Sequence, residues 1–131
     1  MELLGYSFLS LGLFAYLLFV ISPIYFSGGL IGEMRGFLHI FISVFLIFGE
    51  NIGIVIGIFS LILNASILFA PFFLFVDVIP FARIWFAVLS LLAIGLTIWE
   101  VIEQESGEFY WQFYLWPISF VFIAIGFNLL K

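Results

Sequence analysis

The polar side chains that could carry chemistry inside a membrane fall at matching positions of two apolar stretches. In residues 32–43 and again in 53–64, the pattern Gly-x3-Gly-x2-polar-x3-polar recurs at an offset of 21 residues. Its members are Gly32, Gly36, His39, Ser43, Gly53, Gly57, Ser60 and Asn64. On a helix each set shares one face, where small residues let two backbones approach and polar side chains bond across the gap. In an antiparallel pair His39 is level with Asn64, and Ser43 with Ser60, which predicts a polar site near mid-bilayer.

His39 is the only histidine in the chain, and three interpretations of it stay open. As a structural residue it stays neutral and donates a hydrogen bond to a neighbouring helix, which is the interpretation that the apolar surroundings favour. As an ionisable group in a membrane helix it is a candidate for an ion or proton path, with Glu50 as a second member. Glu50 is otherwise a turn residue at headgroup level. As a haem or metal ligand His39 would need a partner from another subunit.

Signatures of catalysis and of metal binding are absent from the sequence. The acidic residues Glu100, Glu103, Glu105 and Glu108 could together bind a divalent cation, but they lack the fixed spacing of a calcium loop and are typical of a solvated loop. There is no phosphate-binding glycine loop, no HExxH and no nucleophile elbow. The absence of cysteine removes thiolate ligands and disulfides. We therefore expect no enzymatic activity, no cofactor and no metal site.

The composition indicates that these residues lie in a lipid environment. Of 131 residues, 66% are hydrophobic and 8% are charged, whereas soluble domains have about 25% charged residues. Apolar runs near the length of a membrane-spanning helix recur along the chain, without the alternation of a membrane barrel. The net charge of −5 argues against nucleic acid as a partner. We expect a single all-α domain, residues 1–131, whose partners are the lipid bilayer and other membrane subunits or copies of itself.

Five transmembrane helices are predicted, over residues 3–26, 30–48, 52–76, 80–101 and 109–130. The second and third need a turn between them, because a single helix over residues 36–76 would be about 61 Å long, twice the thickness of the hydrocarbon layer. Gly49, Glu50 and Asn51 provide this turn, and Asn51 can cap the following helix. In the last helix Gln112, Ser119 and Gly126 share a face that is typical of a packing seam.

The distribution of charge predicts an orientation for these five helices. All basic residues, Arg35, Arg83 and Lys131, then lie on the side opposite the N-terminus, and basic residues near helix ends stay in the cytoplasm. The N-terminus is therefore expected outside and the C-terminus inside, in a plasma (inner) membrane or an organelle membrane. The Glu103–Glu108 loop is placed on the non-cytoplasmic side. Arg83 is expected to reach lipid headgroups, with an ion pair to Asp77 as the alternative.

Two functions fit these expectations. The first is a small non-catalytic integral membrane subunit that packs within, or stabilises, a larger membrane protein complex. The second is a small oligomeric channel or transporter with a mid-membrane polar site at His39, Ser43, Ser60 and Asn64.

Overall fold

The computed structural model describes residues 2–26, 33–49, 51–75, 77–103, 108–109 and 111–130, and most of them are helical. In chain order the elements are α1 (Glu2–Ile21), β1 (Pro23–Phe26), β2 (Glu33–Arg35), α2 (Gly36–Phe45), the 3-10 helix η1 (Leu46–Phe48), α3 (Ile52–Leu68), the 3-10 helix η2 (Ala70–Leu74), α4 (Ile79–Glu103), β3 (Glu108–Phe109), the 3-10 helix η3 (Trp111–Tyr114) and α5 (Leu115–Leu129). The predicted helical class is confirmed.

Three helices are long and apolar enough to cross a membrane, and they are Glu2–Ile21, Ile79–Ile102 and Trp111–Leu129. A fourth apolar helix, Gly53–Leu68, is shorter. The helix predicted over residues 30–48 is much shorter than expected, since α2 has 10 residues. At 1.5 Å per residue it is about 15 Å long, half the thickness of the hydrocarbon layer.

A small sheet occupies the end of the molecule where α1 finishes. The predicted helix over residues 3–26 ends earlier, at Ile21, because Pro23 disfavours a helical conformation in the residue before it. Residues 23–26 instead form the central strand of an antiparallel sheet in the order β2-β1-β3. Tyr25 pairs with Met34 on one side and with Phe109 on the other. The sheet therefore holds the end of α1 beside the start of the last helical region.

The turn before α3 lies where the sequence places it, but Asn51 does not act as predicted. Its side chain makes no capping hydrogen bond to α3. Instead its backbone has a positive φ of 56°, a conformation that asparagine adopts more readily than most residues. Asn51 therefore contributes to the turn through its backbone.

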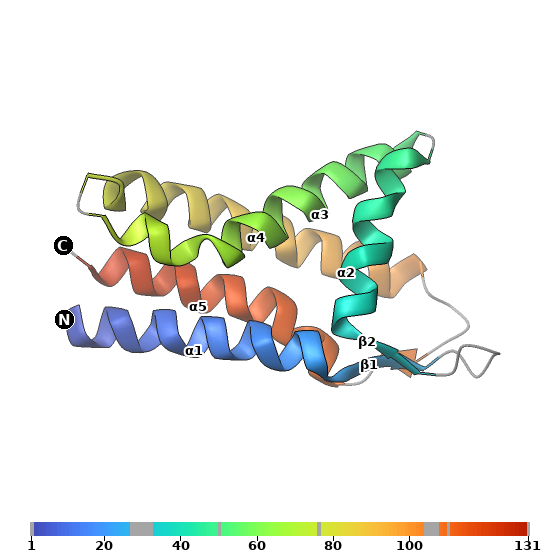
Figure 1. Ribbon diagram of the computed structural model, residues 1–131, viewed down its shortest axis with the longest axis horizontal. Helices are drawn as coiled ribbons and strands as arrows, with labels where there is room; N and C mark the ends of the chain where they lie inside the picture. The colour runs from blue at the N-terminus through green and yellow to red at the C-terminus, as the bar shows by residue number, and fades with distance from the viewer. Residues whose placement is uncertain are drawn as a thin grey trace.

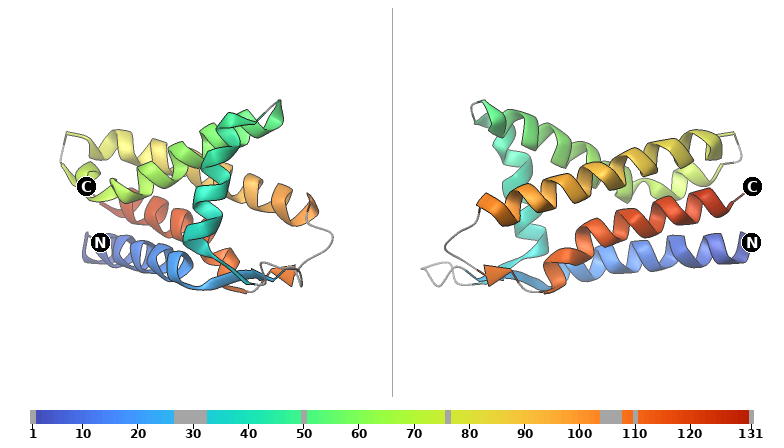
Figure 2. Two further views of the ribbon diagram at one scale, coloured as in Figure 1. Left: turned by 45° about the vertical axis from the view of Figure 1, so that its right-hand side comes forward. Right: turned by 180° about the vertical axis from the view of Figure 1, so that it is seen from behind.

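The long helices lie side by side, with α1 antiparallel to α5 and α4 packed on the other side of α5 (Figures 1 and 2). In contrast, α2 rises steeply from the sheet and forms a hairpin with α3 (Figure 1). Because α2 does not run along the bundle, the chain returns to the end from which it started. Both termini lie together there, and a Cβ added at Gly5 would come within 2.9 Å of Leu130. Five spanning helices and the predicted N-out/C-in orientation, which places the termini on opposite sides of a membrane, are therefore not confirmed.

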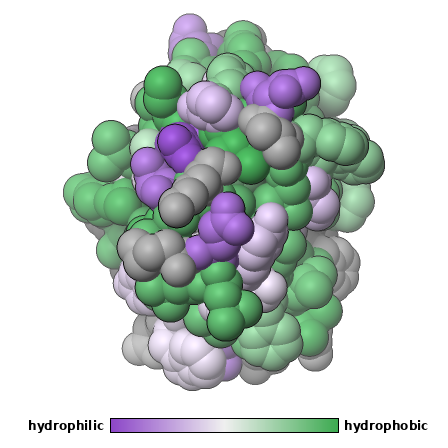
Figure 3. Space-filling model, turned by 90° about the vertical axis from the view of Figure 1, so that its left-hand side faces the viewer, coloured by the Kyte–Doolittle hydropathy of each residue, from purple (hydrophilic) through white to green (hydrophobic). Residues whose placement is uncertain are grey.

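The core is rich in aromatic side chains, and the outer surface is apolar too. Fully buried rings include Phe19, Phe86, Phe113, Phe120 and Phe127. Large apolar side chains also face outward from every long helix, as shown by Leu11, Leu68, Leu91 and Ile118. At the end that carries the termini, hydrophilic residues gather among surrounding hydrophobic ones (Figure 3).

Candidate functional site

Asn64 makes polar contacts that join three helices in the middle of the bundle. Its side-chain oxygen Oδ1 accepts a hydrogen bond of 2.9 Å from the hydroxyl of Tyr16 in α1 and one of 3.0 Å from Nε1 of Trp116 in α5. Its Nδ2 donates a hydrogen bond of 2.8 Å to the carbonyl of Ser60, one turn earlier in α3. We call these four residues the Asn64 cluster. It ties α1, α3 and α5 together.

All four residues of the cluster are buried, with at most 5% of any of them exposed. An amide oxygen has two lone pairs, so the bonds from Tyr16 and Trp116 use the accepting capacity of Asn64 Oδ1 fully. In return, the hydroxyl and the indole N–H each gain the partner that a buried tyrosine or tryptophan needs. The geometry holds helices together, and it leaves the oxygen of Asn64 without a free lone pair for a cation or a substrate.

Aromatic rings enclose this cluster. The ring of Phe19 lies 6.4 Å from that of Tyr16 and 6.4 Å from that of Trp116, between centroids. Trp116 also meets Phe120 edge to face at 5.5 Å. Apolar rings exclude water and lower the local dielectric, which strengthens the hydrogen bonds and makes an unpaired polar group there expensive. Loss of the Asn64 side chain would therefore cost more stability here than at an exposed position, where water could replace the lost hydrogen bonds.

Three of the four α3 residues of the predicted polar site are buried, and they make two separate contacts. Gly57 faces η1, where an added Cβ would come within 2.5 Å of the backbone nitrogen of Ile47. Ser60 and Asn64 lie further along α3 in the cluster described above. Gly53, at the start of the same helix, is only partly buried.

The predicted matching face on the preceding helix is arranged differently. Gly36 is the first residue of α2, and the atoms nearest to a Cβ added there belong to Phe19 and Val20 of α1. Gly36 therefore allows α2 to start against α1, and the nearest atoms to it do not belong to the glycines of α3. Gly32 and Glu50 lie outside the described residues, as do the side chains of His39 and Ser43, so the pairing of His39 with Asn64 stays a prediction.

Two features of the site were not predicted from the sequence. The partners of Asn64 come from helices that are 48 and 52 residues away in the chain. The available signal was Tyr16 itself, because a tyrosine in the middle of an apolar helix needs a hydrogen-bond partner.

The second unpredicted feature is the close contact between α1 and α5. Gly5 and Gly126 face each other, and a Cβ on Gly126 would lie 2.8 Å from the carbonyl oxygen of Gly5. A Cβ added at Gly12 would lie 2.6 Å from the side chain of Ile123 and 2.9 Å from the carbonyl oxygen of Ser119. Ser119 and Gly126 are thus part of a packing seam, as their spacing predicts, and the matching seven-residue spacing of Gly5 and Gly12 was the missed signal.

Arg83 bonds to backbone carbonyls at the end of α5. Its guanidinium donates through Nε to the carbonyl of Phe127 at 3.2 Å and through its second nitrogen to the carbonyl of Leu130. The last carbonyls of a helix have no partners within the helix, and a cation there also compensates the negative end of the helix dipole. Arg83 on α4 therefore caps the end of α5.

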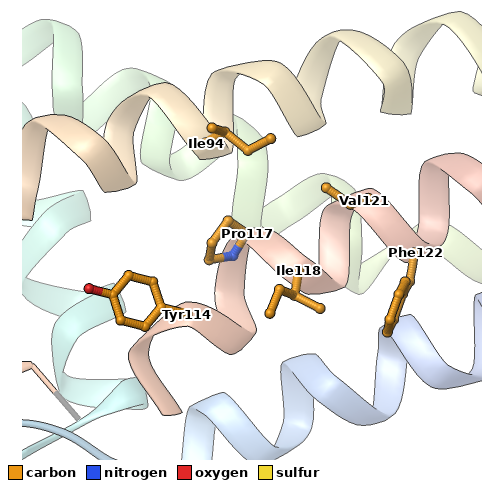
Figure 4. Close-up of a pocket in the computed structure, with 6 residues that line it drawn as sticks. All are labelled: Ile94, Tyr114, Pro117, Ile118, Val121 and Phe122. Atoms are coloured by element: carbon orange, nitrogen blue, oxygen red, sulfur yellow. The ribbon is translucent and has the colours of Figure 1, made fainter. Parts of the chain in front are cut away.

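Two apolar grooves flank α4. One, of about 520 Å³, lies between α4 and α5 and is lined by Ile94, Tyr114, Pro117, Ile118, Val121 and Phe122 (Figure 4). The other, of about 380 Å³, lies between α3 and α4 and is lined by Phe59, Val88, Leu91, Leu92, Gly95 and Leu96. Both are lined almost entirely by carbon atoms, which suits them to apolar occupants.

Among the residues that the structure describes, no group of three or more histidine, cysteine, aspartate or glutamate side chains could hold a metal ion. No protein-family model, curated protein or solved structure matches this chain. The arrangement of the side chains thus supplies the grounds for a functional proposal.

Proposed function

We propose that this protein is a small non-catalytic integral membrane subunit that packs within, and stabilises, a larger membrane protein complex. The observation that carries the proposal is the contrast between its interior and its surface. The Asn64 cluster directs buried polar groups toward one another, across three helices of the same chain. Bulky apolar side chains point outward. A protein with this arrangement offers its apolar surface to neighbouring membrane proteins.

The hairpin of α2 and α3 offers the most prominent part of this surface. On α2 and η1, Phe41, Phe45 and Phe48 follow one another along one side, and their rings contact each other in sequence. Phe48 is 83% exposed. Rings already ordered by their neighbours lose little side-chain entropy when a partner helix covers them, which favours association.

A channel or transporter is supported less well. A transport path through Asn64 would have to displace the bonds from Tyr16 and Trp116, and each buried donor left unpaired costs about 1–3 kcal/mol. The two grooves beside α4 are apolar, and neither attracts ions or polar solutes. These observations favour the subunit over the transporter.

For orientation, we propose that both chain ends face the cytoplasm and that the Glu103–Glu108 loop faces the opposite side of a plasma (inner) or organelle membrane. The termini share one end of the bundle with Arg83, and Lys131 follows directly after the described part of α5. The sheet-bearing end carries Glu100, Glu103 and Glu108. Basic residues near helix ends favour the cytoplasmic side, which supports this orientation.

The proposed function is tested by extracting the protein from its native membrane in a mild detergent and measuring the intact mass of the particle. We expect a heteromeric assembly in which this chain is present in fixed stoichiometry with larger membrane proteins. A particle made only of this chain, whether one copy or several, would contradict the subunit proposal. A homo-oligomer that also conducts ions in liposomes would establish the channel instead.

A further inference from the structure

The hairpin of α2, η1 and α3 is tightly packed within itself, and part of it stands away from the other helices. Inside the hairpin, a Cβ added at Gly57 would come within 2.5 Å of the backbone nitrogen of Ile47. Bulky side chains of both of its helices, such as Phe45 and Val55, are exposed. The end of α2 and the start of α3 lie apart from α1 and α5 (Figures 1 and 2). We call this hairpin the arm.

Two polar residues near the end of α3 join the arm to the three long helices. Asn64 accepts its hydrogen bonds from Tyr16 of α1 and Trp116 of α5. The hydroxyl oxygen of Ser66 accepts a hydrogen bond of 3.1 Å from Nε1 of Trp85 in α4. Both acceptors lie in the last third of α3, so these bonds hold the arm near one of its ends.

We propose that the arm is hinged: it opens from the bundle of α1, α4 and α5 as a unit, and the hydrogen bonds of Asn64 and Ser66 hold it closed.

In a bilayer, these hydrogen bonds hold the arm more specifically than the apolar contacts beside them. Leu63 and Ile67 of α3 are fully buried when the arm is closed. Lipid tails are as apolar as these side chains, so lipid can replace much of their contact when helices separate. Lipid tails offer no hydrogen-bond partner, however, and the three aromatic donors would lose their acceptors. The balance between the closed and the open arm therefore depends on Asn64 and Ser66.

The arm has a pivot at each end. At its start, the N–H of Gly36 donates a hydrogen bond of 3.1 Å to the carbonyl of Ser22, and this glycine lies against the backbone of α1. At its other end, α3 stops at Leu68 and the 3-10 helix η2 follows. Pro71 in η2 has no N–H, so the α-helical hydrogen bond to the carbonyl of Ile67 cannot form. A 3-10 stretch that interrupts a helical segment is typical of a hinge.

The test measures distances between pairs of spin labels by pulsed electron paramagnetic resonance, on the full chain in lipid nanodiscs. The labels are attached to introduced cysteines, since the chain has none of its own. Exposed positions Val55 on the arm and Leu11 on α1 report opening, and Ile42 and Ile58 report changes within the arm. Val55 lies about 20 Å along α3 from the pivot at Leu68, so a tilt of about 15° moves it by about 5 Å.

Asn64→Leu should raise the ratio of molecules with the longer Val55–Leu11 distance to those with the shorter one about tenfold or more, because two hydrogen bonds of the closed arm are lost. Ser66→Ala removes one hydrogen bond at a partly exposed position and should raise this ratio about threefold. The distance between Ile42 and Ile58 should stay the same in both variants. Asn128→Leu is the control, because the amide of Asn128 bonds to a carbonyl of its own helix, and it should leave the ratio unchanged.

An unchanged Val55–Leu11 distance in both Asn64→Leu and Ser66→Ala would overturn the hinge. An equal change in the distance between Ile42 and Ile58 would also overturn it, because the arm would then unfold rather than open. A heteromeric particle in which the arm does not respond to these substitutions would contradict the hinge and leave the subunit proposal intact.

Discussion

Replacing Asn64 with leucine should lower the free energy of unfolding by about 2–4 kcal/mol. The substitution removes the shared acceptor of the Tyr16 hydroxyl and the Trp116 indole N–H, and both donors then stay buried among aromatic rings. An unpaired buried polar group costs about 1–3 kcal/mol. Hydrogen bonds between membrane helices contribute toward the lower part of that range, so we expect the two lost bonds together to cost no more than about 4 kcal/mol. The measurement is unfolding in detergent micelles, followed by circular dichroism.

Asn128→Leu provides a matched control for this substitution. The amide of Asn128 also donates a hydrogen bond of 2.8 Å to a carbonyl one turn earlier, that of Ala124, but Asn128 lies on the partly exposed side of α5. It should destabilise the protein by less than about 0.5 kcal/mol. The double variant Tyr16→Phe/Asn64→Leu should be destabilised by less than the sum of the two single substitutions, because each single substitution already removes the hydrogen bond between Tyr16 and Asn64. Equal effects of Asn64→Leu and Asn128→Leu would contradict a structural role for the cluster.

Gly126→Leu should separate α1 from α5 and destabilise the protein by about 2–3 kcal/mol. Already the first added carbon lies 2.8 Å from the backbone oxygen of Gly5 and 2.7 Å from the side chain of Leu9, so the two helices must move apart. Overpacking of a tight contact typically costs about 1–3 kcal/mol. The displacement also pulls Tyr16 of α1 away from the cluster that contains Trp116 of α5, which places the expectation in the upper part of that range. Thermal unfolding in detergent measures it.

Gly95→Leu is the corresponding control on α4. A Cβ at Gly95 has no atom within 4 Å, so a larger side chain meets open space there. Removing a glycine from a helix interior favours the helix by about 0.5–1 kcal/mol, and Gly95→Leu should therefore be neutral or slightly stabilising. A loss of stability at Gly95 as large as that at Gly126 would show that helix propensity, rather than close contact, determines these effects.

The sequence predicts the chemical nature of this fold well and its topology less well. Composition alone establishes apolar helices, since a chain with 8% charged residues has too few polar groups to cover a soluble surface. The starts of α3 and α4 follow from local signals, a Gly-Glu-Asn turn and Pro80 in the first turn of α4. Such signals depend only on neighbouring residues, which is why they are readable.

The errors arise where distant segments pair. Residues 23–26 are apolar enough for a membrane helix, and only their pairing with residues 33–35 and 108–109 makes them a strand. That strand shortens α1, and the chain finishes at the end of the bundle where it began. The helical face with Ser60 and Asn64 was visible in the sequence, whereas its partners Tyr16 and Trp116 depend on how α1 and α5 approach α3.

The proposed orientation places both chain ends on one side of the membrane and the Glu103–Glu108 loop on the other. Because the chain has no cysteine, single cysteines introduced at Glu2, Lys131 and Gln104 report their own accessibility to a membrane-impermeant maleimide. In sealed vesicles of known orientation, the account predicts that Glu2→Cys and Lys131→Cys react from the cytoplasmic side and Gln104→Cys from the opposite side. Reaction of Glu2→Cys and Lys131→Cys from opposite sides would contradict it and restore the arrangement of five spanning helices.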